Sequence, residues 1–142
     1  MKKKFLTLLC LLFFAVASSQ SILGKWKTID DETGIEKAIV EIYKKDGKVY
    51  GKIIEIFDKS KRSLPCKFCE GNDYNKPILG LVIIKDMKKK DSMYKGGTIT
   101  NPEDGNVYAC RLKLVEDNPN RLQVRGYIAF FYRTQYWVRV GH

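Results

Sequence analysis

The sequence predicts an all-β fold, a single antiparallel up-and-down β-barrel of about eight strands. Three observations predict it: short runs with apolar and polar alternation, no stretch with helical periodicity, and turn-forming residues after nearly every run. Consecutive antiparallel strands leave two unpaired edges unless the sheet closes, which favours a barrel. A two-sheet β-sandwich is the alternative, although its crossovers need longer connections than most found here.

The first half of the chain contains four predicted strands. Residues 22–29 end at the turn-forming Asp-Asp-Glu-Thr-Gly, and residues 36–44 alternate between an apolar and a mainly polar face. Lys-Asp-Gly at 45–47 predicts a tight hairpin into 48–57, because glycine readily adopts a positive φ. Residues 78–85 form the most apolar run, which we expect to be a strand buried on both faces.

The second half contains four more strands. Residues 93–100 end at Asn-Pro-Glu-Asp-Gly, and residues 107–115 alternate Tyr, Cys, Leu and Leu with Ala, Arg and Lys. Asp-Asn-Pro-Asn then turns the chain into 122–128. A bend at 130–133 precedes the last strand at 135–140.

Ahead of the strands, residues 1–19 are expected to be a cleaved signal peptide. Three lysines precede a 13-residue apolar stretch at 5–17, which ends in small residues. That length matches a signal-peptide core and is too short to cross a bilayer. We therefore expect an exported protein, periplasmic or extracellular and not transmembrane, with residues 20–142 forming one β-barrel domain of unknown function.

The charge balance and the histidine content exclude several classes of function. Lys and Arg outnumber Asp and Glu by 26 to 16, and the single histidine is His142. A histidine-based triad or metal site is therefore not expected, nor is any cofactor. The basic residues are scattered with no basic helix, so no nucleic acid is expected as a partner. Peripheral contact with an anionic envelope surface is compatible with the positive charge.

Cys66, Cys69 and Cys110 would remain after leader cleavage, an odd number for an oxidising compartment. Cys66 and Cys69 could form a tight clip, or either could pair with Cys110. The Cys-x-x-Cys spacing also permits thiol exchange, but redox pairs usually open a helix and this segment has the composition of a loop. The long connection at 58–77, which carries the pair, is a candidate lid.

Gly24-Lys25-Trp26, near the start of the first run, is the most specific local signal. In lipocalin-like barrels a Gly-x-Trp stands here, and the tryptophan closes one end of the barrel. A basic residue of the last strand then stacks on its indole ring. Arg139 is that residue here, so we expect Trp26 and Arg139 to form a structural barrel-end pair rather than a catalytic one.

A series of motifs resembles the exported bacterial proteins of the domain of unknown function 2147 family. The resemblance spans nearly all of residues 20–142. It implies a secreted single-domain protein and brings no activity or site residues, because that family is uncharacterised. In chain order the motifs are Gly24-Lys25-Trp26, residues 40–43, 46–53, Cys66-x-x-Cys69, and residues 77–80, 101–105, 122–127 and 134–140.

Arg125 and Tyr127 carry the sharpest ligand-binding hypothesis. They lie two residues apart on one strand and so share a face, with Arg111 and Tyr108 on the preceding strand as further candidates. If that face points inward, it could hold a carboxylate or phosphate, as at the anion-binding end of fatty-acid-binding barrels. The opposite phase places Leu122, Val124 and Ile128 inside and leaves Arg125 and Tyr127 outside.

These observations predict a binding protein without catalysis, for a small amphipathic or anionic ligand such as a lipid, a fatty acid or an envelope fragment. One alternative is an envelope interaction protein with a filled barrel interior and a basic outer face. The other is a thiol-redox accessory protein that uses Cys66 and Cys69. A filled interior favours the first alternative, and a reactive, reducible cysteine pair favours the second.

Overall fold

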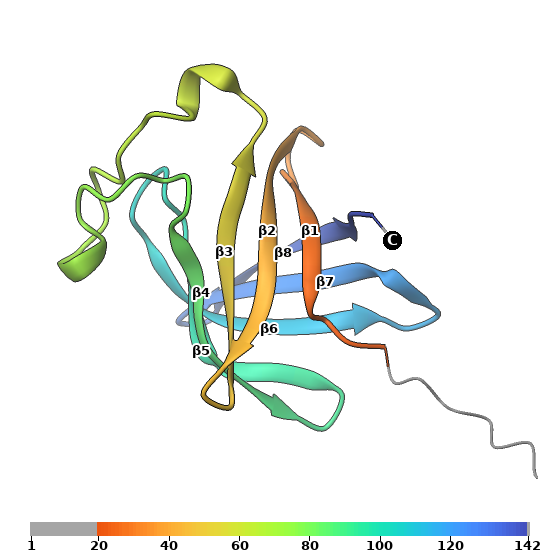
Figure 1. The fold of residues 1–142 in the computed structure, drawn as a ribbon. Coiled ribbons are helices and arrows are strands. Elements are labelled where there is room, and N and C mark those ends of the chain that lie inside the picture. Colours follow the sequence, from red (N-terminus) through yellow and green to blue (C-terminus); the bar gives the residue numbers. More distant parts are fainter. Residues whose placement is uncertain (1–19, 142) are drawn as a thin grey trace, which may run out of the picture.

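The computed structural model describes residues 20–141, and the predicted signal peptide at 1–19 lies outside them. Figure 1 shows a closed antiparallel barrel in which each strand pairs with the next along the chain and the last pairs with the first. The up-and-down barrel is confirmed, and the β-sandwich alternative is wrong. The strands are β1 (Gly24–Ile29), β2 (Glu36–Lys45), β3 (Lys48–Ile56), β4 (Val82–Lys90), β5 (Met93–Thr100), β6 (Val107–Val115), β7 (Asn118–Ile128) and β8 (Phe131–Arg139).

The fourth strand lies further along the chain than the apolar run at 78–85 predicts. Residues 78–81 form a turn instead, in which Gly80 has a φ of 92° and donates its N–H to the carbonyl of Ile53 at 2.8 Å. β4 then continues through a run of lysines, because their backbone pairs with β5, as at Lys88 opposite Lys95. Pairing with a neighbouring strand thus outweighs the polar composition.

Four hairpins have two-residue loops, and one of them differs from the others. Asp46, Asp91 and Asp117 adopt left-handed φ values of 50°, 55° and 65°, which aspartate tolerates better than most residues. The loop between β7 and β8 instead has Ala129 at a φ of 51°, followed by Phe130. The predicted bend at 130–133 is therefore this tight turn, and both flanking strands begin earlier than predicted.

The barrel has two unlike ends. The closed end carries the N-terminal segment and the β2–β3, β4–β5 and β6–β7 turns, and the mouth carries the other four connections. Alternate residues of each strand point inward, and in the closed half these are large and apolar. Trp26 and Trp137 are 0% and 2% exposed. Around them lie Val40, Ile42, Ile84, Met87, Leu112 and Leu122, all fully buried.

Arg139 ties the closed end together. Its guanidinium carbon lies 4.3 Å from the ring centroid of Trp26, the residue opposite it across the β1–β8 seam. The same guanidinium donates hydrogen bonds to the carbonyls of Ser21 (2.7 Å), Leu23 (3.1 Å) and Pro119 (3.1 Å). One side chain therefore joins the N-terminal segment, the first and last strands and the start of β7.

Replacing this side chain tests its structural role. We expect Arg139→Met to lower the free energy of unfolding by about 2 kcal/mol, because the cation–π contact and the hydrogen bonds to three carbonyls are lost together. Arg121→Met is the matched control, since Arg121 stacks on Tyr136 at 4.3 Å on the outer face. Its cost should stay below about 1 kcal/mol. Equal urea midpoints for the two variants would contradict this role of Arg139.

Candidate functional site

At the mouth, most of the inward side chains are partly buried, whereas the tryptophans and their neighbours deeper in the barrel are fully buried. Trp26 is followed two residues later by Thr28, and Trp137 is preceded two residues earlier by Gln135, so both pairs share the inner face. The inner wall of the mouth comprises Thr28, Ala38, Ile99, Tyr108 and Gln135.

Tyr108 forms the aromatic part of this wall. It pairs with Ile99 across β5 and β6, and it crosses the inner side of Gly126 on β7. A Cβ at Gly126 would lie only 3.2 Å from the Cβ of Tyr108, so the glycine makes room for the tyrosine. Of the residues proposed from the sequence to bind a ligand, Tyr108 is the one that the structure places inside the barrel.

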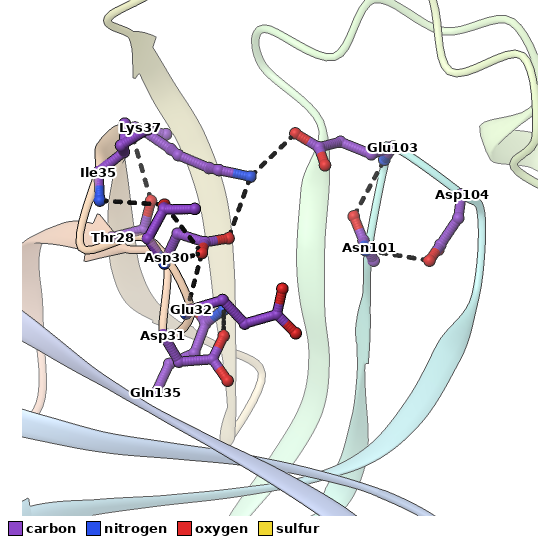
Figure 2. A network of polar contacts seen from close by, with 12 residues as sticks. Thr28, Asp30, Asp31, Glu32, Ile35, Lys37, Asn101, Glu103, Asp104 and Gln135 are labelled. Atoms are coloured by element: carbon purple, nitrogen blue, oxygen red, sulfur yellow. Dashed lines mark hydrogen bonds and ion pairs between the residues drawn. The ribbon is translucent and has the colours of Figure 1, made fainter.

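A charged bridge crosses the mouth (Figure 2). Lys37, at the start of β2, lies 3.2 Å from Glu103 in the β5–β6 turn and 3.4 Å from Asp30 in the β1–β2 turn. Partial burial lowers the pKa of Lys37, but the hydrogen bonds and charges of Glu103 and Asp30 outweigh it and raise this pKa overall. Lys37 is therefore a cation that connects two separate turns.

Asp30 orders the turn that carries it. Its carboxylate accepts hydrogen bonds from the backbone N–H groups of Glu32 (3.0 Å) and Thr33 (2.8 Å) and from the Thr33 hydroxyl (3.0 Å). The bonds from Thr33 are the largest cause that lowers the pKa of Asp30, to about 2. The carboxylate therefore remains charged in all but strong acid and supports both the turn and Lys37.

A second polar chain runs from the core to the mouth. The Trp137 indole donates to the Gln135 side-chain oxygen at 3.1 Å, and the Gln135 amide lies 3.4 Å from Asp31. Asp31 also accepts two bonds from Arg133, each at 2.7 Å. The guanidinium lowers the pKa of Asp31, and the carboxylate raises the pKa of Arg133. The β1–β2 turn is thus fastened to β8.

The long β3–β4 connection lies beside the β5–β6 turn (Figure 1) and contains a disulfide between Cys66 and Cys69. Both sulfurs belong to buried residues, and the Cys66 backbone bonds to Lys76 at 2.7 Å. Gly105 packs so closely on this loop that a Cβ would lie 1.9 Å from the Phe68 carbonyl oxygen. Glycine at this position therefore lets the loop rest against the rim of the mouth.

Cys110 is the third cysteine of residues 20–141 and carries a free thiol inside the barrel. Burial raises the pKa of the Cys110 thiol to about 12, so almost none of it is thiolate near neutral pH. The nucleophilic form of the side chain is the thiolate. Cys110 is therefore a small apolar core residue in the folded protein.

Arg111, Arg125 and Tyr127 lie on the outside of the barrel, so they do not form the luminal anion site considered from the sequence. The pairing of Leu112 with Val124 places these two buried residues inside and their neighbours outside. Ile128, considered for the interior in the same phase, is about half exposed at the mouth. The outer face of β6, β7 and β8 instead carries arginines stacked on tyrosines.

Two shallow clefts lie on the outer side of the barrel near β4. One has a volume of about 180 Å³ and is lined by residues 73–82, and the other has a volume of about 270 Å³ between Tyr43, Tyr50 and Lys85. Within residues 20–141, no three Asp, Glu, Cys or His side chains are arranged to hold a metal ion. The same part of the chain contains no helix long and apolar enough to cross a membrane.

The mouth is the feature that the sequence motifs did not reveal. Asp31 and Arg133 are 102 residues apart, and Lys37 and Glu103 are 66 apart, so no local spacing connects them. The available signal was indirect. Asp30, Asp31 and Glu32 form an acidic turn in a basic chain, at one end of the barrel.

The acid dependence of stability tests the role of Asp30. A lowered pKa means that its carboxylate stabilises the fold at neutral pH, and this stabilisation is lost as the pH falls towards about 2. We expect Asp30→Asn to be less stable than the wild type at neutral pH and equally stable near pH 2. Glu116→Gln, an exposed acid of the β6–β7 turn, is the control and should show no such convergence. A deficit that persists at pH 2 in urea titrations would contradict this role.

At 24% identity and a TM-score of 0.72, the chain is similar to protein HP1028 from the human pathogen Helicobacter pylori, described as belonging to the lipocalin family. The match covers 85% of this chain and 84% of that one and shows a shared lipocalin-like fold. No curated protein matches the sequence at a significant level. A family model described as an uncharacterized protein conserved in bacteria, DUF2147, matches residues 24–139. The chain therefore belongs to this bacterial family.

Proposed function

We propose that this protein is an exported binding protein that holds a small amphipathic or anionic molecule at the mouth of its barrel. One observation carries the proposal: inward side chains in the centre of the barrel, such as Trp26, Leu112 and Trp137, are fully buried, whereas Thr28, Tyr108 and Gln135 at the mouth are partly exposed. The lipocalin-like fold supports a ligand-binding role without catalysis. The signal-peptide pattern at 1–19 supports export.

The mouth has the two chemistries that an amphipathic molecule requires. Ile99 and Tyr108 offer apolar surface on the inner wall, and Lys37 and Arg133 offer cations at the rim. Both cations are already paired with carboxylates, so an anionic head group would replace Glu103 or Asp31 rather than meet an unpaired charge. We expect affinity to depend mainly on the apolar wall.

The contact of the β3–β4 connection with the rim supports a role for this connection as a lid over such a molecule. It rests on the β5–β6 turn through Phe68 and Gly105, and Lys61 lies 3.9 Å from Glu103. A ligand that displaced Glu103 from Lys37 would therefore disturb the contact between the loop and the rim.

The structure bears differently on the two alternative functions. A redox role has no support, because Cys66 and Cys69 are buried and are followed only by a single 3-10 turn at Gly71–Asp73 rather than by an α-helix. An envelope interaction protein is favoured by a specific observation, the packed interior of the closed half.

Native mass spectrometry of the protein gently purified from its own envelope tests the proposed function. We expect a small co-purifying mass in the wild type that denaturation releases. Tyr108→Ala should lower its occupancy about tenfold, because an aromatic face of the apolar wall is lost. Tyr136→Ala removes a similar side chain from the outer face and should leave the occupancy unchanged.

The folded state of both variants is checked by urea unfolding, so that a loss of binding is separated from a loss of structure. Equal occupancy in Tyr108→Ala and Tyr136→Ala would contradict binding at the mouth. Protein that carries no small mass and binds no member of a panel of lipids and organic acids would exclude the proposed function.

A further inference from the structure

The hairpin that joins β7 and β8 carries an exposed apolar surface. The β7–β8 tip is defined as residues 128–132, Ile-Ala-Phe-Phe-Tyr. Phe130 is 98% exposed, Phe131 80%, Tyr132 62% and Ile128 48%. Isolated exposed apolar residues are common, but a contiguous group with three aromatic rings marks a surface that meets a partner.

The backbone of the tip supports this interpretation. The other three two-residue hairpins place aspartate at the left-handed position, whereas here Ala129 occupies it without a side chain that can form local hydrogen bonds. A local preference is thus overridden at the point where Phe130 projects. Departures of this kind concentrate at functional sites.

Behind the tip, the outer face holds a pair of arginines. Arg111 and Arg125 are directly opposite each other on β6 and β7, where like charges repel. Each guanidinium is held over a tyrosine ring, Arg111 at 4.8 Å from Tyr127 and Arg125 at 4.7 Å from Tyr132. A shared anion such as a phosphate would relieve the repulsion and accept hydrogen bonds from both.

The charged side chains of β6, β7 and β8 have one sign, although Asp31 and Glu32 of the β1–β2 turn lie against Arg133. β6, β7 and β8 contain six basic residues and no acidic residue. The six are Arg111, Lys113, Arg121, Arg125, Arg133 and Arg139. Arg133 is paired with Asp31, and Arg139 is engaged at the closed end. The outer face around Arg111 and Arg125 therefore complements an anionic surface.

The spacing between the apolar tip and the arginines matches a membrane surface. Arg125 pairs with Thr134, three residues back along the hairpin from the pair formed by Ile128 and Phe131. At about 3.3 Å per residue this places the arginines about 10 Å behind the tip. Apolar side chains of peripheral proteins insert about 5–10 Å into the boundary between head groups and acyl chains. Arginines at this distance lie at the level of the lipid phosphates.

We propose that the β7–β8 tip inserts into an anionic lipid bilayer while Arg111 and Arg125 bind lipid phosphates. Apolar tip, aromatic rings and cations follow one another in the order of acyl chains, interface and phosphates across a leaflet. This partner differs from the small molecule proposed for the mouth. The inference does not rest on that function, although docking would bring the mouth to the membrane surface.

Vesicle flotation of the processed protein, with its mass verified to lack the leader, tests the proposal. Vesicles contain phosphatidylcholine alone or phosphatidylcholine and phosphatidylglycerol in equal parts. We expect the wild type to float with the mixed vesicles and to bind the neutral ones much more weakly. The double variant Phe130→Ser with Phe131→Ser should lose at least about tenfold in binding to mixed vesicles. Tyr74→Ser, an exposed aromatic of the β3–β4 connection, should bind as the wild type does.

A second pair of variants separates bound phosphates from general charge. Arg111→Gln with Arg125→Gln should weaken binding to the mixed vesicles about fivefold per arginine. Lys88→Gln with Lys89→Gln removes the same charge from exposed positions of β4 and should have much less effect. Tyr108→Ala should leave vesicle binding unchanged, which keeps this result independent of the mouth.

Several outcomes would overturn the proposal. These are equal losses in the arginine and lysine pairs, binding that survives the double phenylalanine variant, and no flotation with either vesicle. Displacement from vesicles by inorganic phosphate, but not by chloride at equal ionic strength, would identify a free-phosphate site instead. A wild-type dimer that the phenylalanine variant converts to a monomer would identify a second copy as the partner of the tip.

Discussion

The seam between β1 and β8 is the constraint on which the rest of the barrel depends. This seam has fewer paired residues than any other strand pair of the barrel: Trp26 lies opposite Arg139, and Lys27 lies opposite Val138. One further hydrogen bond, from the Val140 N–H to the Lys25 carbonyl, extends it. An unclosed sheet would expose two long edges. Arg139 strengthens this seam by its stack on Trp26 and by its bonds to the N-terminal segment. Closure therefore depends on a side chain as well as on backbone pairing.

Closure at that seam also produces a barrel with two unlike halves, one with a packed interior and one with partly exposed inward side chains. The two tryptophans occupy the space that a deep ligand cavity would need, and inward side chains at the mouth, such as Tyr108 and Gln135, are partly exposed. The bonds from Trp137 through Gln135 to Asp31 then connect the packed half to the β1–β2 turn. A rigid core thus positions the polar network of the mouth, while binding surfaces lie on the turns and on the outer face.

Most of the fold follows from local patterns. Alternation with turn residues predicts eight strands, and the Gly-x-Trp with a terminal arginine predicts which residues meet at the closed end. The extent of β4 is not predictable in this way, because its lysine-rich second half becomes a strand only by pairing with β5. The apolar residues at 78–81 belong to a turn instead, in which Gly80 has a φ of 92° and Ile78 and Leu81 pack against the core.

The site was harder to predict than the fold, for two physical reasons. Residues 122–128 read as a strand in either phase, and only the pairing of Leu112 with Val124 places Arg125 outside. The network at the mouth joins turns that are distant in sequence, such as Asp31 and Arg133. Such contacts follow from closure and register, which a local pattern does not contain. The sequence shows Ala129 and Phe130, but it does not show that Ala129 has a positive φ in a tight turn or that the Phe130 side chain is exposed.

We infer that the closed half is packed and that binding takes place at the mouth and on the outer surface. A crystal structure determined under xenon pressure tests it most directly, because xenon enters apolar cavities in proteins. We expect no xenon among Trp26, Leu112, Leu122 and Trp137, whose side chains already fill that space. An ordered xenon atom in that region would show a hidden internal cavity and would contradict the account.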